Sequence, residues 1–433
     1  MKKSYDFPLE VFLVHRAIAS RPRLCFRLLT VGRLLICVLL LSAPSAWSEK
    51  AGFVRTEGDQ LMDGNGHLLM LRGTNLGNWL VQEGYMFRFE QGPQSAREIE
   101  ALTQELLGPE AAAKFWREYR DRYITREDIQ FIKRVGFNSI RVPIHYRFFV
   151  GNDPDGFDLL DRVVEWSREA GLYVIIDMHC APGGQTGTNI DDSWGYPWLY
   201  DSPQEQQLTI DTWKRIALHY RDSKTVLGYD LLNEPIPHFP QLRIYNKDLE
   251  PLYRRIVAGI REVDRNHVVI LGGAQWDTNF DVFGPPFDSN AMYNFHKYWM
   301  PPVKEAVQPY LNFRDRYRVP IWMSESGENK DEWVAQFRQV LDENQIGWAF
   351  WPFKKMDAQS SPVTFSRPIY WDEIVAFAKL RGGTGNAEEQ IAKRPPSDHI
   401  RASFADLLDK IQLHNCQTNE GYLKALGLVA PPQ

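Results

Sequence analysis

Two glutamates each close a strongly apolar run of the sequence, Glu234 at the end of 227–234 and Glu325 at the end of 320–325. A carboxyl group is costly to bury without a partner, so two such endings call for an explanation. Cleavage of a glycosidic bond needs one carboxylic acid that protonates the leaving oxygen and one carboxylate that meets the oxocarbenium-like centre. The pair therefore indicates glycoside chemistry if the fold brings the two side chains face to face. Alone, Glu234 is equally compatible with a helix start, and Glu325 with an ion pair to an arginine.

Other polar or aromatic side chains stand at or near the ends of further apolar runs: Arg141, Asp177, His179, Asn233, His296, Tyr298 and Trp351. Each alone has a structural alternative, as a core histidine, a buried cation or a packed ring. Many such groups converging on one face would be expensive to bury, which favours a site. Asp177 with His179 suggests a metal, but a barrel metal site needs further histidine or carboxylate ligands nearby. We therefore expect neither a metal nor a cofactor.

The elements that would position these residues are eight apolar runs separated by stretches with helical spacing. The runs are 68–73, 139–143, 173–179, 227–234, 268–272, 292–296, 320–325 and 347–351. This alternation predicts an α/β fold, a closed (β/α)8 TIM barrel. Strands four and seven lie across the barrel mouth from each other, so Glu234 and Glu325 would face one another. A doubly wound open sheet is the alternative, but no Gly-rich phosphate loop follows the first run.

The predicted barrel domain spans residues 49–380. It opens with a short hairpin over 51–65, because Asp63-Gly64-Asn65-Gly66 is a strong turn signal between apolar flanks. An insert at 91–123 reads as helical. The Gly-rich sequence after Leu380 marks a break, and residues 381–433 are predicted to form a linker and a C-terminal helical extension packed on the barrel.

Residues 1–48 have the pattern of a signal peptide: four arginines at 21–33, the apolar run 34–41, and small residues before Ser48. The run is too short to span a membrane, which takes about 20 residues. We therefore expect a secreted or periplasmic protein with no integral membrane span after cleavage; an uncleaved anchor is the alternative. Beyond the leader only Cys180 and Cys416 remain, and we expect free thiols rather than a bridge.

The composition narrows the class of partner. A net charge of −5 argues against a nucleic-acid partner, which would call for a basic surface. The 14 Trp, 18 Tyr and 24 Phe would either fill the core or line a groove on which sugar rings stack. We expect a monomer.

Six segments together resemble glycoside hydrolase family 5, whose two glutamates follow barrel strands four and seven. The segments are Asn138–Pro143, Ile176–His179, Leu231–Pro235, Tyr293–Tyr298, Ser324–Gly327 and Trp348–Trp351. Each motif is weak alone, but six in order at barrel spacing are specific, and the resemblance covers about Val54 to Leu380.

The resemblance implies roles for the residues at these positions. Glu234 would be the acid/base and Glu325 the nucleophile of a retaining β-glycosidase. Asn233 would bind the sugar 2-hydroxyl, Arg141 and Tyr298 would hold Glu325 ionised, His179 and His296 would bind hydroxyls, and Trp351 would floor the subsite. The reaction would be a double displacement through a glycosyl-enzyme intermediate on β-glucan oligo- or polysaccharide.

The linkage of the glucan, β-1,3 or β-1,4, stays open. The segments 73–83 and 181–187 are similar to the family's exo-β-1,3-glucanase branch, in which the glutamate matching Glu83 grips a terminal glucose. The stretch 189–198 departs from that branch, and loops after barrel strands set specificity. The outer substrate-binding candidates are Trp79, Glu83, Gln185, Asn189, Trp194 and Trp276. Alternatives on the same site are a transglycosylase, a glucosyl-lipid hydrolase and a catalytically inactive carbohydrate-binding barrel.

Overall fold

The computed structural model describes residues 52–151, 155–381 and 386–429. The signal-peptide segment 1–48 lies outside these residues. Eight parallel strands close into a barrel in which each strand pairs with its neighbours in chain order and the last pairs with the first. The strands are β3 (Arg72–Asn75), β4 (Ser139–His145), β5 (Tyr173–Cys180), β6 (Val226–Asp230), β7 (Val268–Gly272), β8 (Ala291–His296), β9 (Ile321–Glu325) and β10 (Gly347–Phe350). The predicted (β/α)8 barrel is thus confirmed.

Two strands depart from their predicted bounds by four residues at one end, for identifiable reasons. The first run was expected at 68–73, but Leu68 and Leu69 pair with the preceding hairpin, so β3 begins at Arg72. The fourth run was expected to reach Glu234, but β6 ends at Asp230. Beyond it, the Asn233 N–H donates to the Met178 carbonyl and Glu234 takes a φ of 49°, so the chain turns away before the glutamate.

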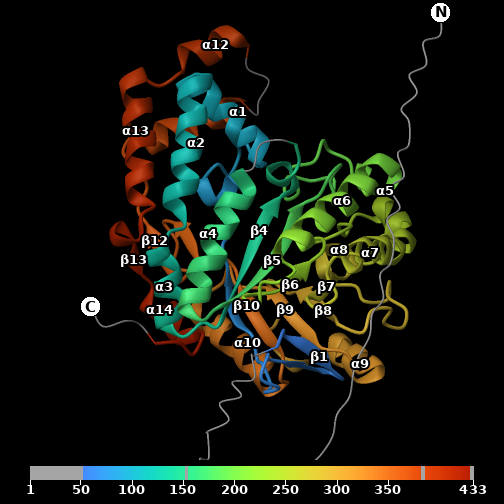
Figure 1. The fold of residues 1–433 in the computed structure, drawn as a ribbon. Helices are drawn as coiled ribbons and strands as arrows, with labels where there is room; N and C mark the ends of the chain where they lie inside the picture. The colour runs from blue at the N-terminus through green and yellow to red at the C-terminus, as the bar shows by residue number, and fades with distance from the viewer. Residues whose placement is uncertain (1–51, 152–154, 382–385, 430–433) are drawn as a thin grey trace, which may run out of the picture. The chain divides into compact units, whose positions relative to one another are not determined.

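The helices surround the barrel (Figure 1). The α-helices are α1 (Ala96–Leu107), α2 (Pro109–Tyr123), α3 (Arg126–Val135), α4 (Asp155–Ala170), α5 (Trp198–Asp201), α6 (Pro203–Tyr220), α7 (Asn246–Arg261), α8 (Ala274–Asp277), α9 (Gln308–Tyr317), α10 (Asp331–Glu343), α11 (Trp371–Arg381), α12 (Ala387–Ala392), α13 (Ser397–Lys410) and α14 (Glu420–Ala425). Short 3₁₀ turns lie at Gly84–Phe87, Tyr146–Phe149, Pro240–Tyr245, Lys304–Ala306 and Leu413–Asn415.

An N-terminal hairpin closes one end of the barrel. Its strands β1 (Arg55–Glu57) and β2 (Gln60–Met62) are antiparallel, and Val54 and Leu61 pack with barrel side chains such as Ile175 and Trp322. The predicted turn at 63–66 is confirmed, because it reverses the chain into the antiparallel bridge between Met62 and Leu68. The turn between β1 and β2 was not predicted. The strands reverse at Gly58 and Asp59, while the turn at 63–66 comes after β2, where the Asp63 carboxylate accepts the N–H groups of Asn65 and His67.

The insert and the C-terminal segment pack on each other. The insert contributes α1 and α2, and α13 lies alongside both in Figure 1. The C-terminal segment is not wholly helical, because the two-residue strand β13 (Gln417–Thr418) pairs with β12 (Val363–Phe365), which in turn pairs with β11 (Lys354–Met356). Both Cys180 and Cys416 are free thiols.

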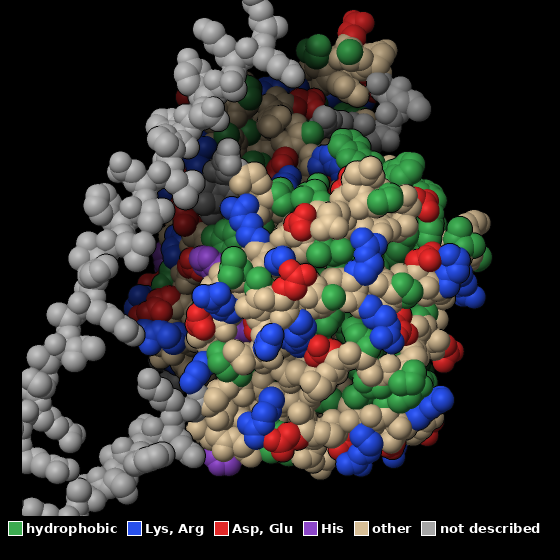
Figure 2. Space-filling model, turned by 45° about the vertical axis from the view of Figure 1, so that its right-hand side comes forward, with side chains coloured by type: hydrophobic (Ala, Val, Ile, Leu, Met, Phe, Trp, Pro, Cys, Tyr) green, Lys and Arg blue, Asp and Glu red, His purple; other side chains and the backbone are tan. Residues whose placement is uncertain are grey.

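On the face seen in Figure 2, basic and acidic side chains of the described residues are interspersed and form no patch of a single charge. Within the described residues, no helix is both long and apolar enough to cross a membrane.

Candidate active site

A cavity of about 580 Å³ opens at the C-terminal ends of the barrel strands. Its walls come from loops after most of the strands, as expected for a barrel enzyme. The lining residues are Glu83, Tyr85, His179, Ile190, Glu234, His238, Trp276, Thr278, His296, Tyr298, Trp299, Glu325, Glu328 and Trp351.

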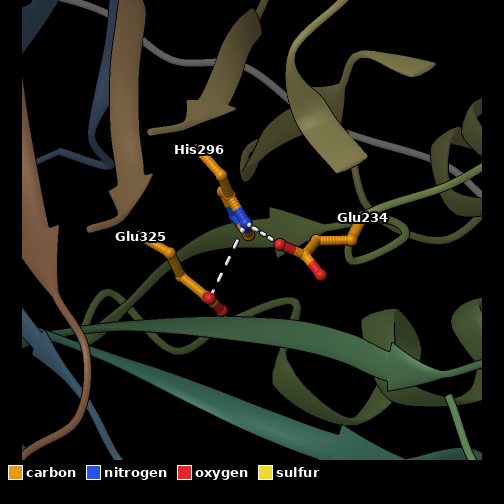
Figure 3. Close-up of side chains that lie close together, drawn as sticks. All are labelled: Glu234, His296 and Glu325. Atoms are coloured by element: carbon orange, nitrogen blue, oxygen red, sulfur yellow. Dashed lines mark hydrogen bonds and ion pairs between the residues drawn. The ribbon is translucent and has the colours of Figure 1, made fainter. Parts of the chain in front are cut away.

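Glu234 and Glu325 reach this cavity from opposite sides, with His296 between them (Figure 3). His296 Nδ1 lies 2.9 Å from Glu234 Oε1 and 3.7 Å from Glu325 Oε2. A carboxylate oxygen of each glutamate lies within 4.8 Å of the other. Burial raises the pKa of Glu234 above its ordinary value, which favours the protonated form. Burial also lowers the pKa of His296 to about 3, so the imidazole is neutral.

Glu325 is held by a cation and a hydroxyl. Arg141 Nη1 donates to Oε1, and the Tyr298 hydroxyl donates to Oε2 at 3.1 Å. The two donors each take one oxygen of the carboxyl group and fix its orientation. Burial and the neighbouring carboxylate of Glu325 raise the pKa of Tyr298 well above its usual value, so it remains a donor.

Arg141 is completely buried and fixes several groups at once. Its Nε donates to Asp230 Oδ2 at 2.8 Å, and Nη2 donates to Asn233 Oδ1 at 2.9 Å and lies 2.9 Å from Asp177 Oδ1. Burial raises the pKa of each aspartate to about 7, although Arg141 opposes the shift. A single buried guanidinium thus contacts three carboxyl groups and an amide and fixes their positions relative to one another.

His179 and Trp351 form one wall of the cavity. Their rings are parallel, with centroids 5.6 Å apart and an interplanar angle of 9°. Asp177 Oδ2 lies 2.9 Å from His179 Nδ1, and the Trp351 Nε1–H donates to the Tyr85 hydroxyl at 2.7 Å. These bonds hold both rings in fixed orientations, which suits a platform for a sugar ring. Tyr85 was not predicted from the sequence.

Asp277 is a buried carboxyl group that the sequence analysis also missed. It ends the turn α8, in which Gln275, Trp276 and Asp277 all have positive φ values of 54–58°. Consecutive left-handed residues are costly, at about 1–2 kcal/mol each, and such strain is concentrated at functional sites. Reciprocal amide bonds between Gln275 and Asn246 brace the turn.

The strained turn directs the carboxyl group of Asp277 toward Glu234 and His296. Asp277 Oδ2 accepts the backbone N–H of Glu234 at 3.0 Å and lies 3.3 Å from His296 Nε2. Its Oδ1 sits against Gly272, where an added Cβ would lie only 2.0 Å away. Both Oδ1 and the nearby Asn294 Oδ1 are buried and find no hydrogen-bond partner among the described residues. Burial, with Asp230 and Glu234, raises the pKa of Asp277 well above its usual range.

The predicted inner residues, Glu234, Glu325, Arg141, His179, Asn233, His296, Tyr298 and Trp351, therefore come together around one cavity. Of the outer candidates, Glu83 and Trp276 line it. Glu83 is buried, and its pKa is raised well above the ordinary value by burial and by Glu325 and Glu234.

The other outer candidates do not line this cavity, and their part in substrate binding stays a prediction. Trp79 is packed in the core, 1% exposed, with its Nε1–H donated to the Arg120 carbonyl. Gln185 is buried and bridges the carbonyls of His179 and Asn233. Asn189 is exposed on the loop after β5, and Trp194 lines a different cavity.

Glu234, His296 and Glu325 also offer three ligand atoms within 4.8 Å of one another, as a metal site would. The guanidinium of Arg141 already contacts Glu325, and its charge would oppose a divalent cation there. The donor set therefore fits a proton-transfer pair better than a metal centre.

Comparisons with known proteins agree with this geometry. The model of the cellulase family, glycosyl hydrolase family 5, matches residues 103–357, more than half of the chain. A beta-xylosidase of Phanerodontia chrysosporium is 30% identical over 297 residues, 65% of this chain and 59% of that enzyme, so the chain spans less than two thirds of it. A probable glucan endo-1,6-beta-glucosidase B of Aspergillus flavus is 27% identical over 66% of the chain and 83% of that protein.

Solved structures support the fold. The crystal structure of an endogalactoceramidase superposes with a TM-score of 0.57 at 19% identity, covering 87% of this chain and 84% of that one. This similarity bears on the barrel alone. With the family model matched across β4 to β11, the chain belongs to glycosyl hydrolase family 5.

Proposed function

We propose that the protein is a retaining β-glycoside hydrolase that acts on β-glucan. The observation that carries the proposal is the approach of Glu234 and Glu325, whose carboxylate oxygens lie within 4.8 Å. Retaining glycosidases hold their two carboxyl groups about 5–5.5 Å apart, whereas inverting enzymes leave about 6.5–9.5 Å for a water molecule. The short separation therefore favours retention.

In the first step, Glu325 attacks the anomeric carbon while the glycosidic C–O bond breaks. Glu234 donates its proton to the leaving oxygen, and its raised pKa suits that task. In the second step, Glu234 takes a proton from water, the hydroxide oxygen bonds to the anomeric carbon, and the bond to Glu325 breaks. Two inversions give net retention.

The surrounding residues divide into sugar-contacting and positioning groups. His179, Asn233 and Trp351 would contact the sugar that reacts. Arg141 and Tyr298 donate hydrogen bonds to Glu325 and hold its carboxyl group in place. We assign Asp277 as a positioning residue, because it fixes the Glu234 backbone and borders His296 without lining the cavity itself.

A substrate panel tests the proposal. Laminarin, carboxymethylcellulose, mixed-linkage glucan, mannan and aryl β-glucosides are incubated with the wild-type protein, and products are sized over time. We expect reducing sugar from at least one β-glucan and none from the Glu325→Ala variant. Failure on all these substrates, with a folded protein, would refute the hydrolase assignment. Product sizing also separates exo from endo action, and longer oligosaccharides at high substrate concentration would reveal a transglycosylase.

A second candidate substrate is a glycoside with an apolar aglycone. Trp299 lines the cavity yet is 76% exposed. Trp276 lines the same cavity, and the rings of His238 and Phe239 pack against it. Such an apolar rim suits an alkyl chain as well as a sugar. Comparison of kcat/KM for octyl and methyl β-glucosides tests this: equal values would exclude a contribution from the rim.

We also propose export through the leader 1–48 and a monomeric state for the mature protein. N-terminal sequencing of the protein recovered from a periplasmic or culture-medium fraction should give a start near residue 49. An intact leader on that protein would favour an anchor instead. Light scattering of the purified protein tests the monomer.

A further inference from the structure

A second cavity, of about 330 Å³, lies at the C-terminal ends of β4 and β5, bordered by α1 of the insert. Its walls include Arg97, Glu100, Tyr146, Arg147, Asp192 and Trp194. The loop after β5 contributes to both cavities, since Ile190 lines the first while Trp194 lines the second. This loop belongs to the stretch 189–198, in which the sequence departs from the exo-β-1,3-glucanase pattern.

Trp194 is held in an exposed position by a well-braced loop. Its side chain is 79% exposed. The buried carboxylate of Asp191 accepts the backbone N–H groups of Thr186 at 2.5 Å and Ser193 at 3.1 Å, which fixes the loop on both sides. The Arg97 guanidinium lies 3.5 Å from the centroid of the indole and supports one face of it. The ring is therefore presented to the cavity rather than left loose.

Both arginines of the cavity are paired with carboxylates, and the third carboxylate, Asp191, accepts backbone N–H groups of its own loop. Arg147 makes a two-pronged ion pair with Glu100, and Arg97 is held by Asp192 through its backbone N–H at 2.8 Å and its Nε at 3.5 Å. The Arg97 Nη1 nitrogen is buried and has no hydrogen-bond partner in the part of the chain that the structure describes. Paired charges attract no net counter-ion, yet they offer both donors and acceptors. An open indole beside such groups matches a neutral polyhydroxylated ring better than an anion or an apolar chain.

We propose that this cavity is a second carbohydrate-binding site, which takes a neutral oligosaccharide segment on Trp194. Its volume is at the lower end of small-molecule sites, which are about 300–1,000 Å³, so it holds a short segment rather than a long chain. The identity of the ligand as a glucan rests on the proposed function. The binding of a sugar in this cavity is independent of it.

The two sites are close enough for one polymer to occupy both. Trp194 is four positions after Ile190, and an extended chain of four steps spans at most about 14 Å between their Cα atoms. An oligosaccharide of a few units covers this span. Linking two weak contacts through one ligand raises the overall affinity without any new contact, because the second contact becomes intramolecular. The site would therefore strengthen polymer binding while leaving small substrates unaffected.

Binding is tested without turnover, in a Glu325→Gln background, by affinity electrophoresis in laminarin and in hydroxyethylcellulose and by calorimetry with laminaripentaose and cellopentaose. Trp194→Ala is compared with Ile391→Ala, which removes a side chain of similar exposure, 75%, from α12. We expect Trp194→Ala to weaken binding of at least one polymer and its pentaose about tenfold, a change of about 1.4 kcal/mol. The control should bind like the parent.

An unchanged affinity of Trp194→Ala for every polymer would overturn the proposal, as would the absence of binding in the parent. Equal weakening by the Ile391 control would do the same. Arg97→Met provides a second variant: it removes the donors beside the indole and should also weaken the polymer complex. Because binding is measured directly, a protein that binds but hydrolyses nothing would refute the proposed function while supporting this site.

Discussion

Replacement of Asp277 by different residues distinguishes three properties of this position. They are the hydrogen bond that its carboxyl group accepts from the Glu234 N–H, the charge of that carboxyl group, and the left-handed backbone conformation. Asp277→Ala removes the acceptor and leaves a buried N–H unpaired, which costs about 1–3 kcal/mol. If this loss raises the activation free energy by displacing Glu234 in the transition state, kcat/KM drops about 10–100-fold, since about 1.4 kcal/mol corresponds to a factor of ten.

Asp277→Asn keeps an acceptor for the Glu234 N–H and places an NH₂ group beside the orphaned Asn294 Oδ1. Because the raised pKa of Asp277 favours its neutral form, the amide imitates it, and we expect kcat/KM to stay within about threefold of wild type. Asp277→Gly removes the carboxyl group but accepts the φ of 58° without strain. It should therefore match the alanine variant in activity while unfolding at a higher urea concentration.

The assay is the pH profile of kcat/KM for an aryl β-glucoside with a poor leaving group. An ionised Asp277 would raise the pKa of Glu234, so its removal by Asn would move the alkaline limb to lower pH. A neutral Asp277 predicts an unmoved limb in the Asn variant. The reasoning would be refuted if Asn were as damaging as Ala, or if all three variants matched the wild type.

Three further outcomes are expected. Glu234→Ala should keep activity on glucosides with good leaving groups, lose it on poor ones, and recover turnover with added azide; uniform loss without rescue would contradict an acid/base role. Arg141→Met should destabilise the fold by about 3–5 kcal/mol, because it leaves buried carboxyl groups without their cation. The pKa values of Asp177 and Asp230 are about 7 in the folded state, above the ordinary value of 3.8. The folded state is therefore stabilised at low pH, and this stabilisation is lost as the pH rises through 7. The loss of unfolding free energy caused by Arg141→Met, measured in urea, should be larger at pH 8 than at pH 5. Trp276→Ala should raise KM for oligosaccharides more than for aryl glucosides. Equal changes in KM would show that the indole of Trp276 does not contact the additional sugar units of an oligosaccharide.

The residues around Glu234 and Glu325 could be predicted from the sequence, because in a barrel the order of a strand along the chain determines its place around the barrel. Once the eight apolar runs are counted, the residues after strands four and seven must share one face, whatever the loops do. Arg141 and His296 were placed correctly for this reason, since each lies within or at the end of a strand. Their chemical roles stay predictions until they are tested.

The outer part depends on loop paths, which local patterns do not determine. Trp194 and Gln185 belong to one loop, yet one is exposed at a second cavity and the other is buried between carbonyls. Asp277 escaped notice because nothing in Gly272–Asp277 announces a left-handed turn of three non-glycine residues. The turn at 63–66 was predicted, but the one at Gly58 and Asp59 was missed because both lie within one short stretch and the signal at 63–66 is the stronger.

The central claim is that Glu325 attacks the sugar and Glu234 serves as acid/base. The most direct test is to incubate the protein with a 2-deoxy-2-fluoroglucoside that carries a good leaving group, digest it, and locate the label by mass spectrometry. We predict one added fluoroglucosyl group per chain, on Glu325, and no label in Glu325→Gln. A label on Glu234, or inverted products from the unlabelled enzyme, would contradict the account.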